Sequence, residues 1–211
     1  MVWTVILCLV IGYALGNIQS GILLSRVLDK DIRKEGSHNP GTTNMLRTYG
    51  NAAGAVTLLV DFGKAVLAVL IGRWIAGGEN EMLNLYCSMA GGLGVILGHN
   101  WPALFGFKGG KGVACTAAVV CLIFPGAGGM AGLIWFIVVG FSRYVSLASI
   151  VFGASYAINV IFMQAFRADI PALPGIPFSL IICALIILRH RENMKRLWQG
   201  NERMLSFKKK K

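Results

Sequence analysis

Long apolar stretches make up most of this 211-residue chain, and three polar segments interrupt them. Hydrophobic residues account for 55% of the sequence, charged residues for 14%, and the mean hydropathy is +0.66. A soluble domain averages about 25% charged residues, and an apolar stretch of about 20 residues can cross a bilayer as a helix. The sequence therefore predicts an all-α, polytopic membrane bundle that forms one domain over residues 1–211, without a separate soluble domain.

The apolar stretches divide into segments that are predicted to be transmembrane helices. The seven segments are 2–25, 52–76, 83–98, 113–124, 128–141, 144–165 and 176–189. Two of them are short, but Pro125 followed by Gly126 supplies a break between them. If residues 113–141 crossed the membrane only once, the strongly basic C-terminus would lie outside, against the positive-inside rule. With two crossings, the basic residues on the outer side are Arg73 and Arg167. We expect seven spans, with the N-terminus outside and the C-terminus inside.

The formal net charge of +11 is also a property of nucleic-acid-binding proteins. Here the basic residues lie beside predicted spans, where topology and anionic membrane lipids account for them, so no nucleic acid is expected. The five cysteines lie in apolar segments without a metal-ligand pattern and are interpreted as small packing residues. Glycines within the spans, such as Gly12 and Gly16, predict close helix packing. No metal and no cofactor are expected.

The strongest single motif is a glycine turn at residues 107–112, within the polar segment 98–112 and directly before an apolar run. Glycines leave backbone N–H groups free to point at an anion, the following helix N-terminus adds a favourable dipole, and lysines add full charges. The candidate phosphate ligands are Lys108, Gly109, Gly110, Lys111 and Gly112. The spacing is not that of a Walker loop. A basic turn that touches lipid headgroups is equally compatible with the motif alone.

The first polar segment, residues 31–47, combines hydroxyl and amide side chains with glycine and proline. Such a loop presents many neutral donors in fixed geometry, and an arginine can bind a phosphate through two hydrogen bonds. The candidate substrate ligands are Ser37, Asn39, Asn44 and Arg47. A plainer interpretation is that Thr42, Thr43 or Asn44 caps the second span.

The third polar segment, residues 189–202, places His190, Asn193 and Arg196 at three-residue steps, and Glu202 follows. Side chains at that spacing share one face of a helix. A histidine at a membrane surface can be a general base, a phosphate ligand or an interfacial residue. The asparagine and the arginine on the same face favour a role in a site.

Within the second span, Asp61 and Lys64 stand three residues apart. Charges inside a span are unfavourable, and these two can neutralise each other. Two interpretations stay open: an ion pair that locks the bundle, and one that supports a functional site.

The three polar segments resemble, in order and spacing, the three cytoplasmic motifs of the bacterial acyl-phosphate:glycerol-3-phosphate acyltransferase family. The resemblance extends over essentially the whole chain. In that family the first motif carries a serine and an arginine important for activity, and the glycine-rich second motif is associated with glycerol 3-phosphate binding. The third motif carries a histidine, an asparagine and a glutamate. The matching residues outside the glycine turn are Ser37, Arg47, His190, Asn193 and Glu202. His38, Thr42 and Ala65 depart from residues common in the family, but none of them removes a matched functional group.

The resemblance implies transfer of a long-chain acyl group from acyl phosphate to the 1-hydroxyl of glycerol 3-phosphate, the first step of phospholipid synthesis. It implies a multi-pass protein of the bacterial inner membrane with its site facing the cytoplasm, and a peripheral acyl-phosphate-forming enzyme as a partner that supplies the donor. Catalytic roles fall to Ser37, Arg47, His190 and Asn193. Substrate-binding roles fall to Asn39, Asn44, Lys108, Gly109, Gly110, Lys111, Gly112, Arg196 and Glu202. No Ser-His-Asp or Cys-His arrangement is visible, so positioning and electrostatic stabilisation are expected to drive the reaction.

The alternative function is a transporter or exchanger of a phosphorylated metabolite. Transporter sites tend to lie near the bilayer midplane between repeated halves. In this sequence the polar groups gather at one interface and no repeat is visible. A lipid-binding structural protein is a third candidate, which would need the basic residues but not the hydroxyl, amide and imidazole groups.

Overall fold

The computed structural model describes residues 1–28, 30–78, 80–166 and 172–205. Arg167 and Lys208–Lys211, used above to predict the orientation, lie outside the described residues. The described part of the chain forms two compact units, one within residues 1–119 and one within residues 120–207. A single domain over the whole chain stays a prediction.

The first unit contains five α-helices and two short 3₁₀ turns among its described residues. The helices are α1 (Val2–Gly16), α2 (Ser20–Val27), α3 (Thr42–Tyr49), α4 (Asn51–Ala76) and α5 (Glu81–Asn100), and the turns are η1 (Ile32–Lys34) and η2 (Ala103–Phe105). Helix α6 (Val113–Ile123) runs from the first unit into the second. The second unit continues with α7 (Pro125–Ser142), α8 (Val145–Phe166), α9 (Ala172–Arg189) and α10 (Arg191–Trp198).

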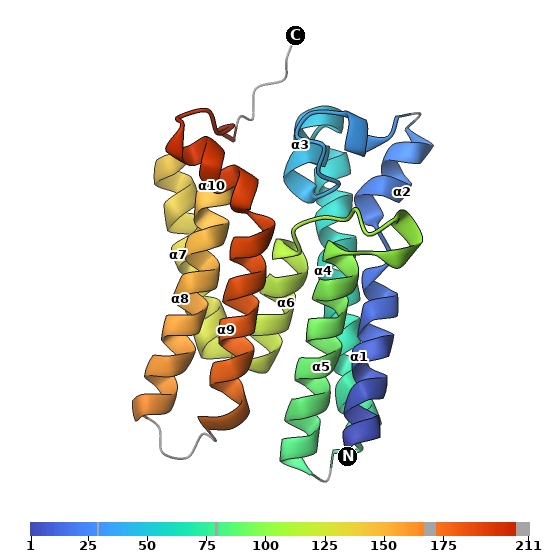
Figure 1. Cartoon of the computed structure of the whole chain (residues 1–211), viewed down its shortest axis with the longest axis vertical. Coiled ribbons are helices and arrows are strands. Elements are labelled where there is room, and N and C mark those ends of the chain that lie inside the picture. Colours follow the sequence, from blue (N-terminus) through green and yellow to red (C-terminus); the bar gives the residue numbers. More distant parts are fainter. Residues whose placement is uncertain (29, 79, 167–171, 206–211) are drawn as a thin grey trace. The chain divides into compact units, whose positions relative to one another are not determined.

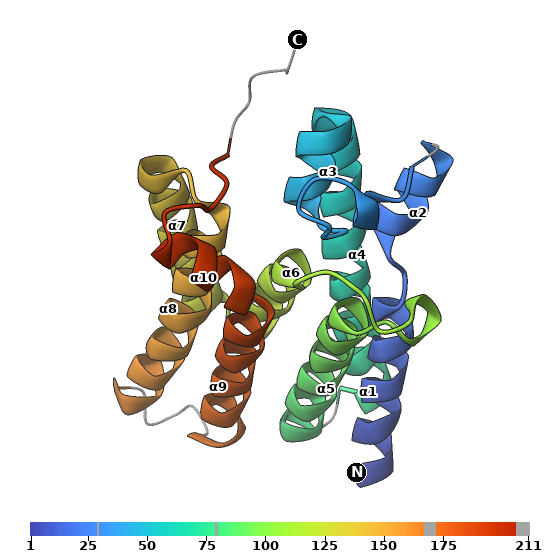
Figure 2. The ribbon, with the colours of Figure 1, turned by 45° about the horizontal axis from the view of Figure 1, so that its top comes forward.

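The predicted all-helical membrane fold is confirmed. Five described helical segments are long and apolar enough to cross a membrane, and a sixth is added if Pro174–Arg189 and Arg191–Trp198, which meet at a 60° bend, count as one. Figure 2 shows this bend between α9 and α10. Helix α6 is a shorter apolar helix of 11 residues. Each of the seven predicted segments is thus largely helical, while the number of crossings and their orientation stay predictions.

The predicted break at Pro125 is confirmed, because α6 ends at Ile123 and α7 begins at Pro125. Proline suits the first turn of a helix, where its missing N–H has no partner to lose.

The first predicted span, 2–25, is confirmed as the apolar helical segment Val2–Val27, but this segment is not one continuous helix. It breaks between α1 and α2, where the side-chain amides of Asn17 and Gln19 are buried. Asn17 Nδ2 donates to the Tyr13 carbonyl at 2.8 Å, and Gln19 Nε2 donates to the Gly16 carbonyl at 3.0 Å. These side chains bond backbone carbonyls at the break, so the chain can leave the helical path without burying unpaired polar groups.

Helices α1, α4 and α5 stand side by side in the first unit (Figure 1). Glycines make the contact between α1 and α5 close. A Cβ added to Gly12 would collide with the carbonyl of Gly91, and one added to Gly16 would lie 2.5 Å from the Val95 carbonyl oxygen. The close packing predicted from Gly12 and Gly16 is therefore confirmed.

Candidate active site

The glycine turn lies between η2 and the start of α6. The chain turns through left-handed backbone conformations at Gly106 and Phe107, with φ of 64° and 60°, and again at Gly112, with φ of 74°. Lys108 is exposed, and Lys111 is half-buried. The turn thus brings two cations to the N-terminus of α6, where unpaired N–H groups and the helix dipole favour an anion.

The buried glycines of this turn pack against the C-terminal end of α5. Gly110 N donates to the His99 carbonyl at 3.0 Å. A Cβ at Gly110 would collide with His99 Nε2, and a Cβ at Gly109 would collide with the His99 carbonyl. Gly112 faces the amide of Asn100, whose Oδ1 would lie 2.7 Å from an added Cβ. The glycines are therefore required by packing within the protein, and phosphate approach to their backbone stays a prediction.

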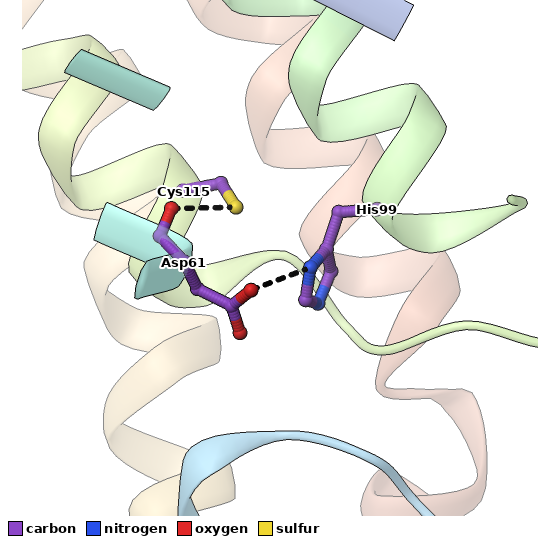
Figure 3. Close-up of side chains that lie close together, drawn as sticks. All are labelled: Asp61, His99 and Cys115. Atoms are coloured by element: carbon purple, nitrogen blue, oxygen red, sulfur yellow. Dashed lines mark hydrogen bonds and ion pairs between the residues drawn. The ribbon is translucent and has the colours of Figure 1, made fainter. Parts of the chain in front are cut away.

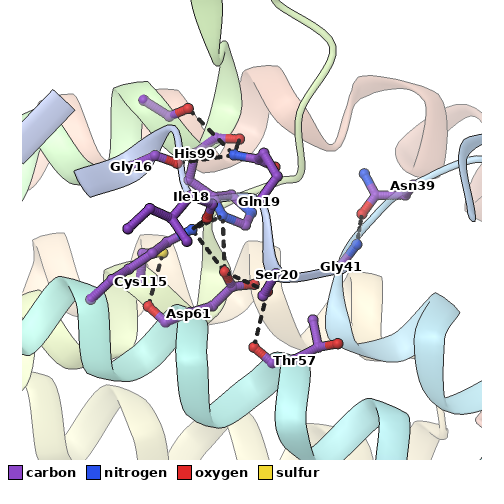
Figure 4. Close-up of polar contacts among 12 residues, drawn as sticks. Gly16, Ile18, Gln19, Ser20, Asn39, Gly41, Thr57, Asp61, His99 and Cys115 are labelled. Atoms are coloured by element: carbon purple, nitrogen blue, oxygen red, sulfur yellow. Dashed lines mark hydrogen bonds and ion pairs between the residues drawn. The ribbon is translucent and has the colours of Figure 1, made fainter. Parts of the chain in front are cut away.

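Asn44 organises the first polar segment from within. Its Oδ1 accepts a hydrogen bond from Ser37 N at 2.9 Å, and its Nδ2 donates to the Glu35 carbonyl at 3.0 Å. The side chain is buried, as expected for a group that shapes the loop. Asn39 Oδ1 accepts from Gly41 N at 3.0 Å just before α3 (Figure 4). Both amides thus hold the backbone that carries the half-buried Ser37.

Capping of the second span by Thr42, Thr43 or Asn44 is wrong. These residues form the first turn of α3, a separate helix, and the N-cap of α4 is Gly50, without a side-chain hydrogen bond. Arg47 lies in α3 and is half-buried.

His190 is buried at the junction of α9 and α10 and is the N-cap residue of α10. Its ring Nδ1 lies 2.8 Å from the carbonyl oxygen of Ile186. Because a carbonyl oxygen only accepts, Nδ1 carries a proton. A neutral His190 therefore holds its lone pair on Nε2, whereas a protonated one donates from both nitrogens.

Glu202 accepts hydrogen bonds from two of the other candidate residues of the third segment. Its carboxylate accepts hydrogen bonds from Asn193 Nδ2 at 2.8 Å, Arg196 Nε at 2.8 Å and Ser146 Oγ at 2.9 Å. Burial raises the pKa of the Glu202 carboxyl, but these hydrogen bonds outweigh it and hold the pKa below its ordinary value. The shared face of Asn193 and Arg196 is confirmed. Ser146, near the start of the predicted span 144–165, was missed because a lone serine there has no distinguishing signal.

A second polar cluster is buried in the first unit. The predicted ion pair is confirmed, with Lys64 Nζ 2.8 Å from Asp61 Oδ1. The structure adds His99 Nδ1, 3.5 Å from the same oxygen, and Ser20 Oγ, which donates to it at 2.9 Å (Figures 3 and 4). Sequence reasoning missed Ser20 and His99, although a histidine at the end of a predicted span was a usable signal.

The ligand atoms of Asp61, His99 and Cys115 lie within 4.8 Å of one another, a spacing compatible with a metal ion. Lys64 Nζ, however, bonds the same Asp61 oxygen and lies 3.0 Å from His99 Nδ1, so a cation would have to displace it. A Cys-His arrangement, absent from the sequence prediction, does occur here. Cys115 Sγ nevertheless donates to the backbone carbonyl of Asp61 at 3.2 Å (Figure 3), which leaves the thiol without the base a nucleophile requires.

Known proteins match this chain along most of its length. The family model described as "Glycerol-3-phosphate acyltransferase" matches residues 6–200. A glycerol-3-phosphate acyltransferase of Clostridioides difficile is 39% identical over 212 residues, covering 99% of this chain and 98% of that protein. Glycerol-3-phosphate acyltransferase 2 of Moorella thermoacetica is 42% identical over 201 residues, covering 95% of this chain and 97% of that protein.

Two solved structures are also similar. The crystal structure of PlsY (YgiH), an integral membrane glycerol 3-phosphate acyltransferase, in its glycerol 3-phosphate form has a TM-score of 0.83 and 34% identity, covering 96% of each chain. The lysophosphatidic acid form has a TM-score of 0.78 and 33% identity over the same coverage. These matches define an integral membrane acyltransferase of helical fold. Within that class, the chain belongs to the glycerol-3-phosphate acyltransferase family.

Proposed function

We propose that the protein transfers a long-chain acyl group from acyl phosphate to the 1-hydroxyl of glycerol 3-phosphate, giving 1-acyl-glycerol 3-phosphate and inorganic phosphate. The observation that carries the proposal is the glycine turn, which presents Lys108 and Lys111 at the N-terminus of α6. Phosphate groups favour such a position, and both proposed substrates carry one. The related solved structures in glycerol 3-phosphate and lysophosphatidic acid forms support the acceptor and the product.

The proposed donor follows from the chemistry that the chain offers. Acyl phosphate is a mixed anhydride, so its carbonyl is already activated. The acceptor oxygen forms a bond to that carbonyl carbon, the bond to the phosphate oxygen breaks, and phosphate leaves with the electron pair. A covalent enzyme intermediate is unnecessary, which fits a Cys115 thiol engaged with the Asp61 carbonyl.

The protein's part is then to hold two anionic groups and to stabilise developing negative charge. The turn at residues 108–112 is assigned to the phosphate of glycerol 3-phosphate, and Arg47 to charge that develops during transfer. His190 is assigned to hold a substrate phosphate. The phosphate of the substrate, with up to two negative charges, can accept the proton of the attacking hydroxyl.

The place of the reaction is part of the proposal. Basic residues beside the predicted spans favour a multi-pass protein of the bacterial inner membrane with its site facing the cytoplasm. The acyl tail of a donor can lie among apolar helices while its phosphate remains at the polar interface. A peripheral acyl-phosphate-forming enzyme would supply such a donor.

Purified protein in detergent tests the proposal directly. With glycerol 3-phosphate as acceptor, we expect turnover with a long-chain acyl phosphate and little with the matching acyl-coenzyme A thioester. The matched control is Arg47→Ala prepared in parallel, which reveals contaminating enzymes. Equal rates with both donors, absent from the control, would overturn the assigned donor. No acylation with either would overturn the function.

A further inference from the structure

The buried polar cluster of the first unit has no part in the proposed chemistry. Its ionisable members, Asp61, Lys64 and His99, are 1%, 5% and 4% exposed. Asp61 and Lys64 come from α4, whereas His99 comes from the end of α5. Groups of this kind are seldom fully buried without a role for their geometry.

The Lys64 ammonium has three acceptors for its three protons. They are the Ile18 carbonyl oxygen at 2.5 Å, Asp61 Oδ1 at 2.8 Å and His99 Nδ1 at 3.0 Å. The first of these becomes available because α1 ends at Gly16 and α2 begins at Ser20. An ammonium has no lone pair, so His99 Nδ1 accepts and the neutral ring carries its proton on Nε2.

The opposite edge of the same ring meets the glycine turn. An added Cβ at Gly110 would collide with His99 Nε2, and Gly110 N donates to the His99 carbonyl at 3.0 Å. Gly109 lies against that carbonyl and against Pro102, whose Cδ would be 2.5 Å from an added Cβ. His99 therefore contacts the turn through both its side chain and its backbone.

We propose that Asp61, Lys64 and His99 are positioning residues for the glycine turn. The ion pair fixes the orientation and tautomer of the imidazole, and the imidazole fixes Gly109 and Gly110. The position of the glycine turn then determines where Lys108, Lys111 and the N-terminus of α6 can bind an anion. The cluster acts on substrate through the loop and does not touch the reacting atoms.

Two substitutions of His99 distinguish a positioning role from a role in packing alone. In His99→Gln the side-chain amide nitrogen reaches close to the place of Nε2 and can still meet the turn. In His99→Asn the shorter amide keeps an acceptor near Lys64 but withdraws from Gly110. Both variants keep the Asp61–Lys64 ion pair. Asp61→Asn combined with Lys64→Met removes both charges together, which avoids leaving one of them buried alone.

The first measurement follows the loop itself. Limited trypsin cleavage after Lys108 and Lys111 in detergent is quantified by mass spectrometry, relative to cleavage after the exposed Lys195 of the second unit. We expect cleavage in the turn to be about tenfold faster in His99→Asn and in the double variant, and near the wild-type rate in His99→Gln. The matched control is Val69→Ala, which removes buried methyl groups from the same helix α4 and should leave the relative rate unchanged.

The second measurement is kinetic and rests on the proposed function. His99→Asn should raise the apparent KM for glycerol 3-phosphate about tenfold while changing kcat less than about threefold, and His99→Gln should stay near wild type. Unchanged cleavage and unchanged KM in His99→Asn would overturn the proposal, as would His99→Asn behaving closer to wild type than His99→Gln. If the double variant does not fold, the two His99 variants decide. Failure of the wild-type enzyme to acylate glycerol 3-phosphate refutes the function but leaves the cleavage comparison intact.

Discussion

At the scale of single residues, one carboxylate accepts hydrogen bonds from two other residues of the third polar segment. Glu202 accepts from Asn193 and Arg196 of α10 and from Ser146 of α8. Asn193, which the resemblance assigns to catalysis, and Arg196, which it assigns to substrate binding, are thus both hydrogen-bonded to Glu202. Charge-assisted hydrogen bonds of this kind fix side-chain orientation. Glu202 therefore holds the Asn193 and Arg196 side chains of α10 in place without a bound ligand.

This arrangement predicts a pH dependence of stability. The pKa of Glu202 in the folded protein lies below its ordinary value near 4.5, so the stabilisation is complete above that value and is lost as the pH falls toward the folded-state pKa. The midpoint of thermal unfolding in detergent, followed from pH 7 to about pH 3, should fall less in Glu202→Gln than in wild type. Glu192→Gln, at an exposed position, should keep the wild-type profile. Identical profiles in all three proteins would contradict the assignment.

Arg47 is predicted to act mainly on the rate. Removing a cation that faces developing charge should lower kcat by about 100-fold or more in Arg47→Ala. Arg47→Lys should recover a part only, since a point charge does not replace a two-pronged guanidinium. Steady-state kinetics with acyl phosphate and glycerol 3-phosphate measure both effects. Wild-type kcat in Arg47→Ala would remove Arg47 from the catalytic residues.

His190 is predicted to hold phosphate rather than to accept the hydroxyl proton. In that role His190→Gln should retain much more activity than His190→Ala, because the amide still donates a hydrogen bond. The pH–rate profile should keep its shape. A general base predicts the reverse, with both variants equally inactive and a limb near the ordinary histidine pKa of about 6.5 lost. The Nδ1 bond to the Ile186 carbonyl fits both roles, so the pair of variants decides.

At the scale of helices, the break between α1 and α2 connects to the polar cluster. Gln19 Nε2 donates to the Gly16 carbonyl at 3.0 Å and to the His99 carbonyl at 3.2 Å, and Gln19 is 1% exposed. Gln19→Leu has a similar size but leaves these buried carbonyls without this donor. We expect a loss of about 1–3 kcal/mol in the free energy of unfolding. Denaturation in detergent measures it, and Leu23→Ala, at a half-exposed position of α2, should change it much less. Equal losses would show that the amide is not needed at the break.

The sequence was sufficient for most helices and for the break at Pro125, because hydropathy and proline act locally. It was insufficient for the break at residues 17–19. Asn17 and Gln19 become helix breakers only through partners brought together by folding, such as the His99 carbonyl, which is 80 residues away from Gln19. The same holds for Ser146 and Ser20. A serine inside an apolar stretch is common, and its importance appears only when a buried carboxylate from another element meets it.

The glycine turn has a packing role that its sequence motif does not reveal. The sequence predicts these glycines as anion ligands because they leave backbone N–H groups free to point at an anion. In the structure, Gly109 and Gly110 also have no room for a Cβ, because His99 and Pro102 occupy it. The pattern of residue types therefore predicts a glycine turn, whereas its contacts with His99 and Pro102 are visible only in the folded structure.

At the scale of the whole molecule, the proposed function requires the three polar segments to face the same side of the membrane. Charge distribution predicts the cytoplasmic side for all of them. In a background without the five native cysteines, single cysteines at Lys34, Leu104 and Lys195, which are exposed in the structure, should resist a membrane-impermeant thiol reagent in intact cells and react after permeabilisation. Glu81→Cys, at the exposed start of α5 and near the other end of the predicted spans, should react in intact cells.

The predicted spans cross the membrane an even number of times between residues 104 and 195. If only Lys195→Cys reacted in intact cells, that number would be odd, and His190 would lie on the other side of the membrane from the glycine turn. Reaction at any one of the three would therefore refute a single site that uses all three segments, even if the acyltransferase activity itself were established.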